Sequence, residues 1–429
     1  MIDSVLAMQL IILVFAVGYF AIIFEYSVRI NKTASSLLMA VLCWLFVFIC
    51  SGHEISHDVA VLGEHVNNVS QIIYFLLGAM TLVELVDCHR GFKVITDVIE
   101  TNSKRKMLWL IGFVTFFLSA ILDNLTTTIV MVSLLRKLVP DREDRLMLGA
   151  TIVIAANAGG AWTPIGDVTT TMLWINGNLS TVEVMKALFA PSMAALIVAL
   201  SMFSFSVKGK FPKSQKKEAE TSEPGGKLIF YCGVGALIFV PIFKSLTGLP
   251  PFMGMLIALG MLWLITDLMH HPYKGREHLR VPQILTRIDI SGVLFFLGIL
   301  LCIGALESVG ILSGLANFLD VYVHNLPLIA TIIGLISAVV DNVPLVAATM
   351  GMYDLQTYPM DSSLWQLIAY CAGTGGSILI IGSAAGVALM GLEKIDFLWY
   401  FKKVSWVALI SYLSGVVVYM IQSQILSAM

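Results

Sequence analysis

The sequence consists of one apolar stretch after another, and most of these stretches have the length needed to cross a lipid bilayer. The hydrocarbon core of a bilayer is about 30 Å thick and takes roughly 20 apolar residues in helical form. The apolar stretches cover residues 5–24, 34–50, 69–86, 107–139, 146–175, 184–207, 228–243, 252–269, 288–306, 326–352, 364–392 and 397–425. We therefore expect an all-α integral membrane protein whose first stretch is a membrane helix and not a signal peptide.

The composition excludes several other classes of protein. Hydrophobic residues make up 58% of the chain and charged residues 13%, whereas a soluble domain carries roughly 25% charged residues. So few charges cannot cover a surface that faces water, which excludes soluble enzymes, disulfide-rich secreted scaffolds and disordered chains. The net charge of −2 predicts no nucleic-acid partner. The six cysteines form no CxxC pair, and no GxxxxGK[ST] loop occurs, so no cofactor is expected.

The distribution of basic residues predicts the orientation in the membrane, because connections rich in Lys and Arg stay in the cytoplasm. Lys and Arg are concentrated in the connections 88–106, 136–145, 208–217 and 274–287 and absent from the connections 51–68, 176–182, 320–326 and 353–362. The basic connections are therefore predicted to be cytoplasmic, and the N-terminus is predicted to lie outside. Since both ends of segment 107–139 are cytoplasmic, this segment is predicted to be a re-entrant hairpin that enters and leaves on that side.

A second copy of this hairpin indicates an internal repeat. SAILDNLTTTIVM (119–131) is followed by SAVVDNVPLVAATM (337–350), and each copy precedes a span interrupted by glycines. We expect a first repeat in 1–207, a cytoplasmic linker in 208–226 and a second repeat in 227–429. Each repeat would contain three spans, a hairpin, a broken span and a final span. Five complete crossings per repeat would insert the second repeat upside down, so hairpin 326–352 would enter from outside. Inverted repeats with broken helices at the midplane are typical of secondary transporters.

Polar residues in these apolar segments are the candidate site. Asp123 and Asp341 are carboxylates in the predicted membrane interior, where a charge costs at least about 2.5 kcal/mol and usually serves a function. Both could also cap helix N-termini, as could Asn124 and Asn342. Amphipathic segments 89–101 and 311–323 could lie along the membrane interface or form ordinary connecting helices.

Glycines in the broken spans are expected to unwind the helix and expose carbonyl groups to an ion. Carboxylate and carbonyl oxygens are the ligands that hard cations prefer. The predicted ion ligands of the first repeat are Asp123, Asn124, Thr126, Asn157, Gly159, Gly160 and Thr163, and those of the second repeat are Asp341, Asn342, Thr374 and Gly375. Asp167 could be a ligand or proton carrier, or it could cap a helix in an outer cavity. Asp123, Asp167 and Asp341 are the candidate proton-coupling residues, and no resident metal is expected.

Five stretches resemble the NhaD-type sodium/proton antiporter family of the ion-transporter superfamily. The most specific are FFLSAILDNLTTTIVMVSLLRKL (116–138), VIAANAGGAWTPIGDVTTTMLW (153–174) and SAVVDNVPLVAATMGMY (337–353); segments 75–92 and 295–316 also match. Dicarboxylate carriers of the superfamily are similar but have a Ser-Asn-Thr tip, where this chain has Asp123 and Asp341. The resemblance implies export of Na⁺ and Li⁺ driven by proton entry, in a bacterial inner membrane and as a homodimer.

Two other functions remain as alternatives. The first is an anion carrier for a dicarboxylate or an oxyanion, which the buried acids and the absence of Lys or Arg from the predicted centre disfavour. The second is a zinc protease, because residues 53–57 spell HExxH. This pentapeptide is expected in a short outer connection and not on a long helix, and it leaves the rest of the chain unexplained. A secondary transporter, and not an enzyme, is therefore the expected function.

Overall fold

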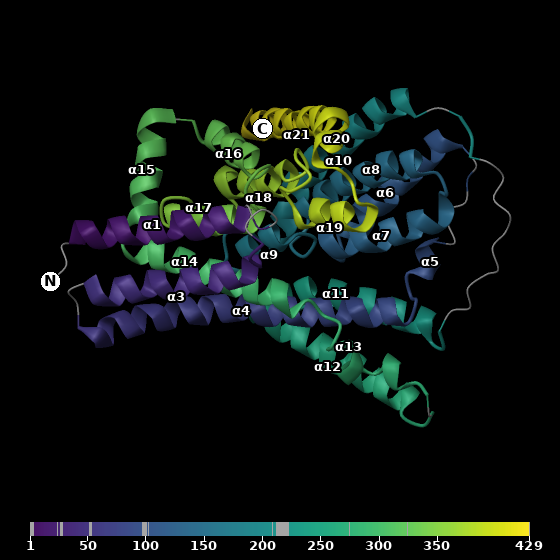
Figure 1. Ribbon diagram of the computed structural model, residues 1–429, viewed down its shortest axis with the longest axis horizontal. Coiled ribbons are helices and arrows are strands. Elements are labelled where there is room, and N and C mark those ends of the chain that lie inside the picture. Colours follow the sequence, from purple (N-terminus) through teal and green to yellow (C-terminus); the bar gives the residue numbers. More distant parts are fainter. Residues whose placement is uncertain are drawn as a thin grey trace.

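The protein is helical throughout the part of the chain that the structure, a computed structural model, describes (Figure 1). The described residues are 4–23, 25, 29–50, 54–96, 101, 103–207, 209–211, 223–273, 275–323 and 325–428. They contain no strand, only one isolated bridge between Ser103 and Lys210. Seven described helices are long and apolar enough to cross a membrane, or eight if the bent pair Ile311–Val323 and Leu326–Ile336 forms one span. The prediction of an all-α membrane protein is therefore confirmed.

The first half of the chain contains two apolar segments that each consist of two helices with a short interruption between them. Its helices are α1 (Ser4–Ile23), α3 (Lys32–Cys50), α4 (Ile55–Cys88), α5 (Lys93–Thr96), α6 (Lys104–Ser119), α7 (Asn124–Leu138), α8 (Arg142–Ala161), α9 (Val168–Ile175) and α10 (Thr181–Ser206). The segment 107–139 forms the contacting pair α6 and α7, and the segment 146–175 forms α8 and α9. The interruption between α6 and α7 includes Asp123, and the interruption between α8 and α9 follows Gly159 and Gly160.

The second half contains the corresponding interruptions in the same order. Its elements are α11 (Gly226–Thr247), α12 (Pro251–His270), η1 (Glu277–Leu279), α13 (Val281–Ile284), α14 (Ile290–Ser308), α15 (Ile311–Val323), α16 (Leu326–Ile336), α17 (Asn342–Met352), α18 (Ser363–Gly375), α19 (Ala384–Glu393), α20 (Phe397–Lys403) and α21 (Ser405–Ala428). The predicted final stretch 397–425 is thus two helices. The amphipathic segment 311–323 is α15, whereas much of segment 89–101 lies outside the described residues.

Helix α4 differs most from the prediction, because it starts at Ile55 and not near residue 69. Its first turns carry polar residues such as Glu64, Asn67 and Asn68, which are exposed. A search for apolar stretches misses such turns, since polar residues are compatible with helix where the backbone hydrogen bonds are satisfied within it. The connection expected at 51–68 is therefore largely helical.

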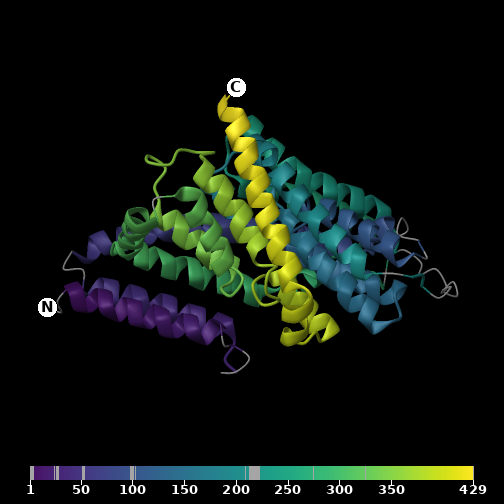
Figure 2. The same ribbon diagram turned by 90° about the horizontal axis from the view of Figure 1, so that it is seen from above.

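The two halves interlock around the interrupted helices. Helix α19 contacts α7 and α8, and α9 contacts α17 and α18. In Figure 1, α6, α7 and α8 lie on the right of the molecule and α15, α16 and α17 on the left; the colours of Figure 2 give the same arrangement from above. The hairpins therefore approach the centre from opposite ends of the long axis. Every residue of α8 from Leu148 to Ala161 is buried.

Candidate functional site

An aspartate caps the second helix of each hairpin. Asp123 precedes α7 and accepts hydrogen bonds from the backbone N–H of Thr126 at 2.8 Å and from the Thr126 hydroxyl at 2.7 Å. Asp341 precedes α17 and accepts one hydrogen bond, from the backbone N–H of Val343 at 3.4 Å. Both carboxylates lie at helix N-termini, where the helix dipole favours negative charge. The capping interpretation therefore describes the local contacts of both aspartates.

Asn124 joins the first hairpin to the first broken span. Its Nδ2 donates hydrogen bonds to Asp167 Oδ2 at 2.7 Å and to Asn157 Oδ1 at 3.0 Å. Asp167 is 1% exposed and caps α9. Its Oδ1 accepts hydrogen bonds from the backbone N–H and the hydroxyl of Thr169, at 2.9 and 2.7 Å. Asp167, whose location the sequence left open, thus lies in a buried cluster and also caps a helix.

Asn157 extends this cluster into the second half of the chain. The residue is fully buried, and its Nδ2 donates hydrogen bonds to Ser377 Oγ at 2.8 Å and to Ser383 Oγ at 2.9 Å. Both serines belong to the interruption between α18 and α19. A continuous series of hydrogen bonds therefore runs from Asp167 through two asparagines to the second broken span.

The two broken spans share one backbone design but differ in chemistry. A Cβ atom on Gly160 would collide with the carbonyl oxygen of Gly166, and a Cβ atom on Gly376 would lie 2.6 Å from the carbonyl oxygen of Gly382. Each following residue caps the next helix: Asp167 caps α9, and Ser383 caps α19 by accepting from Gly386 N–H at 3.2 Å. A carboxylate in the first half therefore corresponds to a hydroxyl in the second.

The predicted role of the glycines in unwinding the helix is wrong for the first broken span. Gly159 and Gly160 lie within α8, which ends at Ala161, and Gly375 is the last residue of α18. A Cβ atom on Gly159 would collide with the carbonyl oxygen of Phe116, and one on Gly375 with that of Gly334. These glycines therefore allow each broken span to pack directly against the first helix of its hairpin.

The other predicted ligands lie close by but take little part in the cluster. The Thr163 hydroxyl donates to the carbonyl oxygen of Ala120 at 2.7 Å and so ties the first break to the hairpin tip. The Thr374 hydroxyl donates to the Tyr370 carbonyl within its own helix. Asn342 is the first residue of α17, as Asn124 is of α7, and both are buried. The hydrogen bonds to Asp167 and Asn157 come from Asn124 and not from Asn342.

A lysine lies beside Asp341 at the tip of the second hairpin, which we call the second tip. The sequence predicts a centre without Lys or Arg. Lys32 Nζ is 4.0 Å from Asp341 Oδ2 and 4.6 Å from the centre of the Phe295 ring. In the sequence, this lysine lies in the connection between the first two apolar stretches, 5–24 and 34–50. It reaches the tip because α3 begins at Lys32 and packs along α14, which carries Phe295.

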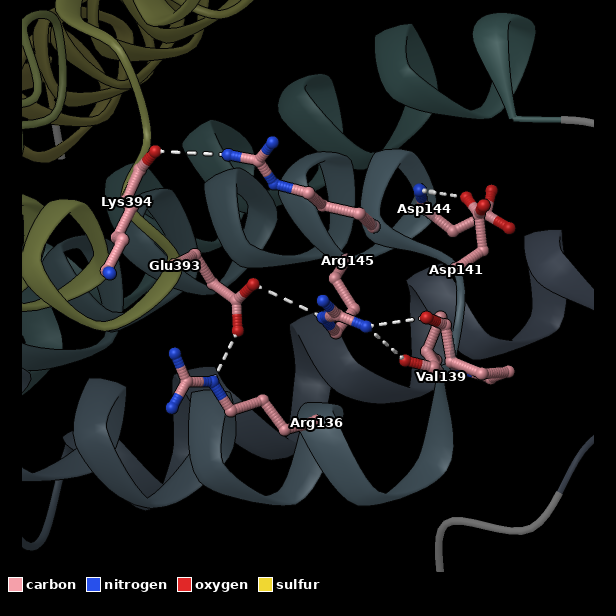
Figure 3. Close-up of polar contacts among 9 residues, drawn as sticks. Arg136, Val139, Asp141, Asp144, Arg145, Glu393 and Lys394 are labelled. Atoms are coloured by element: carbon pink, nitrogen blue, oxygen red, sulfur yellow. Dashed lines mark hydrogen bonds and ion pairs between the residues drawn. The ribbon is translucent and has the colours of Figure 1, made fainter.

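A buried carboxylate joins the two halves at the far end of α7. The Glu393 side chain is 3% exposed. Arg136 Nε donates to its Oε1 at 2.7 Å, and Arg145 Nε donates to its Oε2 at 3.2 Å (Figure 3). Arg142 adds a hydrogen bond to the Lys394 carbonyl at 3.3 Å. The connection between α7 and α8 is thereby fixed to the end of α19.

The described part of the HExxH pentapeptide lies at the start of a long helix. The first residue of the pentapeptide, His53, is outside the described residues, while Ile55 to His57 form the first turn of α4. The argument from a short outer loop is therefore wrong. Within the described chain, no three His, Cys, Asp or Glu side chains lie together in a way that could hold a metal ion.

Thr169, Ser377 and Ser383 are polar residues of the cluster that the sequence analysis did not identify. Ser383 could have been found by aligning the two breaks, since Gly376, Gly382 and Ser383 follow the order of Gly160, Gly166 and Asp167. Ser377 has no such counterpart in the first break, where Ala161 occupies the position.

Comparison with known proteins assigns the chain to a family. The sequence model of a family described as citrate transporter matches residues 10–366. Sodium/proton antiporter 1 and sodium/proton antiporter 2 of Arabidopsis thaliana are 57% and 54% identical to the chain; each comparison covers 95% of this chain, and 71% and 98% of the relatives. The Na⁺/H⁺ antiporter NhaD of Alkalimonas amylolytica is 30% identical, over 95% of this chain and 89% of the relative. The chain therefore belongs to the citrate transporter family and, within it, to the NhaD-type sodium/proton antiporters.

Proposed function

We propose that the chain exports Na⁺ in exchange for protons and that the cluster of Asn124, Asn157 and Asp167 is its central cation site. The observation that carries this assignment is the convergence of Asp167 Oδ2 and Asn157 Oδ1 on one amide group, 2.7 and 3.0 Å from Asn124 Nδ2. A cation in the place of this amide would meet two oxygens, one of them charged. Rotation of the Asn124 side chain would supply a third. Oxygen ligands of this kind suit Na⁺ and Li⁺.

Exchange follows from competition between Na⁺ and a proton for the same carboxylates. An apolar environment disfavours a bare carboxylate, so an empty site favours the protonated acid. Binding of Na⁺ then requires loss of the proton, and a proton that enters from outside expels Na⁺. Asp167 is the main candidate for this coupling, and Asp123 and Asp341 remain candidates at the two tips. The carboxylates of Asp123 and Asp341 lie close enough to act on Asp167 electrostatically.

The remaining predicted ligands have supporting roles in this proposal. Thr126 fixes the Asp123 carboxylate, Thr163 fixes the first break to the tip, and Gly159, Gly160 and Gly375 permit close packing of the broken spans. Asn342 and Thr374 would contribute ligands only after the second tip rearranges. Gly373 brings α18 close to the cluster, because a Cβ atom there would lie 3.6 Å from Asp167 Oδ2.

The proposed architecture consists of two inverted repeats, 1–207 and 227–429, joined by a cytoplasmic linker at 208–226. Hairpin 107–139 enters from the cytoplasm, hairpin 326–352 enters from outside, and the N-terminus lies outside. The matching order of interrupted helices and the approach of the hairpins from opposite ends in Figure 1 support this proposal. The basic residues that flank the first hairpin support its cytoplasmic side.

The proposed setting is a bacterial inner membrane, with the chain assembled as a homodimer in the lipid bilayer. Bacterial relatives named Na⁺/H⁺ antiporter NhaD support this location, whereas the Arabidopsis relatives come from a plant. Transport of Li⁺ in addition to Na⁺ rests on the ligand chemistry. No cofactor, resident metal or nucleic acid is part of the proposal.

An anion carrier is the second candidate, since the matching family is described as citrate transporter and Lys32 provides one positive charge near the centre. The three aspartates at 123, 167 and 341 outnumber this lysine. When these aspartates are ionised, their combined charge would repel a dicarboxylate. The cation therefore remains the better substrate.

Transport by purified protein in lipid vesicles tests the assignment. Na⁺-driven proton movement should occur in the wild type and be abolished in Asp167→Asn, Asp123→Asn and Asp341→Asn, each of which keeps the size of the side chain. Glu183→Gln, at an exposed ion pair with Lys186, is the control and should exchange normally. Near-native exchange by any one aspartate variant would remove that residue from the mechanism, and citrate uptake without Na⁺ exchange would favour the anion carrier.

A further inference from the structure

The two tip aspartates have different surroundings. Both carboxylate oxygens of Asp123 accept short hydrogen bonds from Thr126, at 2.8 and 2.7 Å. The Asp341 carboxylate has one hydrogen bond, from Val343 N–H at 3.4 Å, which is longer than the usual range for this kind of bond. Its other close partner is the ammonium group of Lys32. The first carboxylate is therefore held by neutral donors of its own helix, and the second lies beside a cation from another helix.

Lys32 has one further contact at its backbone and one at its ammonium group. Lys32 is the first residue of α3, and its backbone N–H donates to Glu25 Oε1 at 3.1 Å. Its Nζ lies 4.6 Å from the centre of the buried Phe295 ring, within the range of a cation–π interaction. Since α3 packs along α14, these contacts hold the charge against the second tip.

The pair is nevertheless accessible to water and to ions. The side chain of Lys32 is 36% exposed and that of Asp341 is 24% exposed. Water screens such a pair, so the attraction between the two charges is modest. Another cation can therefore replace Lys32 beside the Asp341 carboxylate. Lysine has a flexible stem of four carbons that allows the ammonium group to withdraw.

We propose that Lys32 is the resident counter-ion of Asp341 and that the transported cation competes with its ammonium group for this carboxylate. The inference rests on the proposed function, because it assigns a role to one lysine in Na⁺ binding by an antiporter. When Asp341 is ionised and no Na⁺ is bound, Lys32 neutralises its charge. Na⁺ binds the carboxylate when the lysine moves away from it. Lys32 is thus a positioning residue that sets the apparent Na⁺ affinity, and it makes no bond to Na⁺.

The direction of the effect is the test, because removal of a competitor should tighten Na⁺ binding. We expect Lys32→Gln to lower the KM for Na⁺ about threefold to fivefold, the range that a partly exposed ion pair supports. Lys32→Arg keeps the charge and should keep KM within about twofold of the wild type. Lys186→Gln removes a lysine from an exposed pair elsewhere and controls for the change in surface charge.

A purely structural role of Lys32 gives a different result, namely a lower maximal rate and lower thermal stability with an unchanged or raised KM. Lys32→Met retains the aliphatic stem against Phe295 and replaces the Gln variant if that protein does not fold. Initial rates are measured in vesicles at equal pH on both sides, together with Na⁺-dependent protection against thermal unfolding in detergent. If the wild type exchanges Na⁺ but neither neutral variant binds it more tightly, the inference is wrong. If the wild type shows no exchange, the proposed function itself fails.

Discussion

At the scale of single residues, the cluster depends on hydrogen bonds that cross between the halves. Asn157 has its two donors on Ser377 and Ser383, so its Oδ1 can face Asn124. A buried amide has few ways to satisfy all of its donors and acceptors, and loss of a partner costs about 1–3 kcal/mol. The orientation of Asn157, and with it one oxygen of the proposed cation site, is therefore set by two serines of the second broken span.

Ser383→Ala tests this dependence. The substitution removes one acceptor from Asn157 and the cap of α19, for which we expect a loss of about 1 kcal/mol in the free energy of unfolding and at least a tenfold lower exchange rate. Ser411→Ala is the matched control, because Ser411 is also buried but its hydroxyl donates to Ala195 between α10 and α21. Rates and thermal unfolding are measured on both variants; equal exchange by the two would contradict a special role of Ser383.

His89 provides a pH-dependent contribution to stability. This residue follows α4, is fully buried, and has Nδ1 2.7 Å from the Leu85 carbonyl and Nε2 2.9 Å from His270 Nε2. Burial lowers the pKa of His89 to about 4, below the value of about 6.5 for an exposed histidine. The unfolded chain therefore binds a proton that the folded chain does not bind between these values, and acid favours unfolding there.

We expect the stability from neutral His89 to be complete above about pH 6.5 and to fall as the pH drops towards about 4. The slope contributed by His89 approaches about 1.4 kcal/mol per pH unit. Thermal unfolding of the purified protein across this range measures it. His89→Gln should reduce the loss of stability between about pH 6.5 and about pH 4. His278→Gln, at an exposed position, should leave this loss unchanged. If the His89 variant loses as much stability at acid pH as the wild type, other groups cause the loss.

At the scale of helices, the sequence predicted where the spans break but not how the pieces meet. The motifs around Asp123 and Gly160 carry local signals: a residue type that caps helix N-termini in the first, and adjacent glycines in the second. Both breaks could therefore be located from the sequence. The contact between Asn124 and Asp167 depends on how α7 packs against α8, which no local pattern encodes. Lys32 was misjudged for the same reason, because charge bias predicts the side of a connection and not its distance from a hairpin tip.

Glu393→Gln tests the junction that joins α7, α8 and α19. The Glu393 carboxylate is almost fully buried, while Arg136 and Arg145 are 47% and 20% exposed and can recover some hydration. We therefore expect a loss of about 1–3 kcal/mol in the free energy of unfolding, somewhat below the usual cost of breaking a fully buried pair. Glu183→Gln, in a pair whose side chains are 67% and 51% exposed, should change stability little. Thermal unfolding in detergent compares the two, and equal stability would mean that the buried pair does not hold the helices together.

At the scale of the whole molecule, the proposed inversion explains why the halves are alike in order and unlike in charge. Repeats that insert in opposite directions present corresponding connections to opposite sides of the membrane. The connection 139–141 and the first turn of α8, which carries Arg142 and Arg145, then face the cytoplasm, while connection 353–362 faces outside and carries neither Lys nor Arg. The two broken spans meet back to back, which brings Asn157 of one against Ser377 and Ser383 of the other.

Single-cysteine labelling in a variant that lacks the native cysteines tests the inversion. A cysteine at Glu143 should react with an impermeant maleimide only when the reagent is on the cytoplasmic side, and a cysteine at Thr357 only when it is outside. Both positions lie just beyond the second helix of a hairpin, and both side chains are exposed. A cysteine in the 208–226 linker should react from the same side as a cysteine at position 143, and the cysteine-free protein must still exchange Na⁺. Labelling of positions 143 and 357 from the same side would mean that the hairpins enter from one side. The repeats would then be parallel, and the charge difference between the two connections would need another explanation.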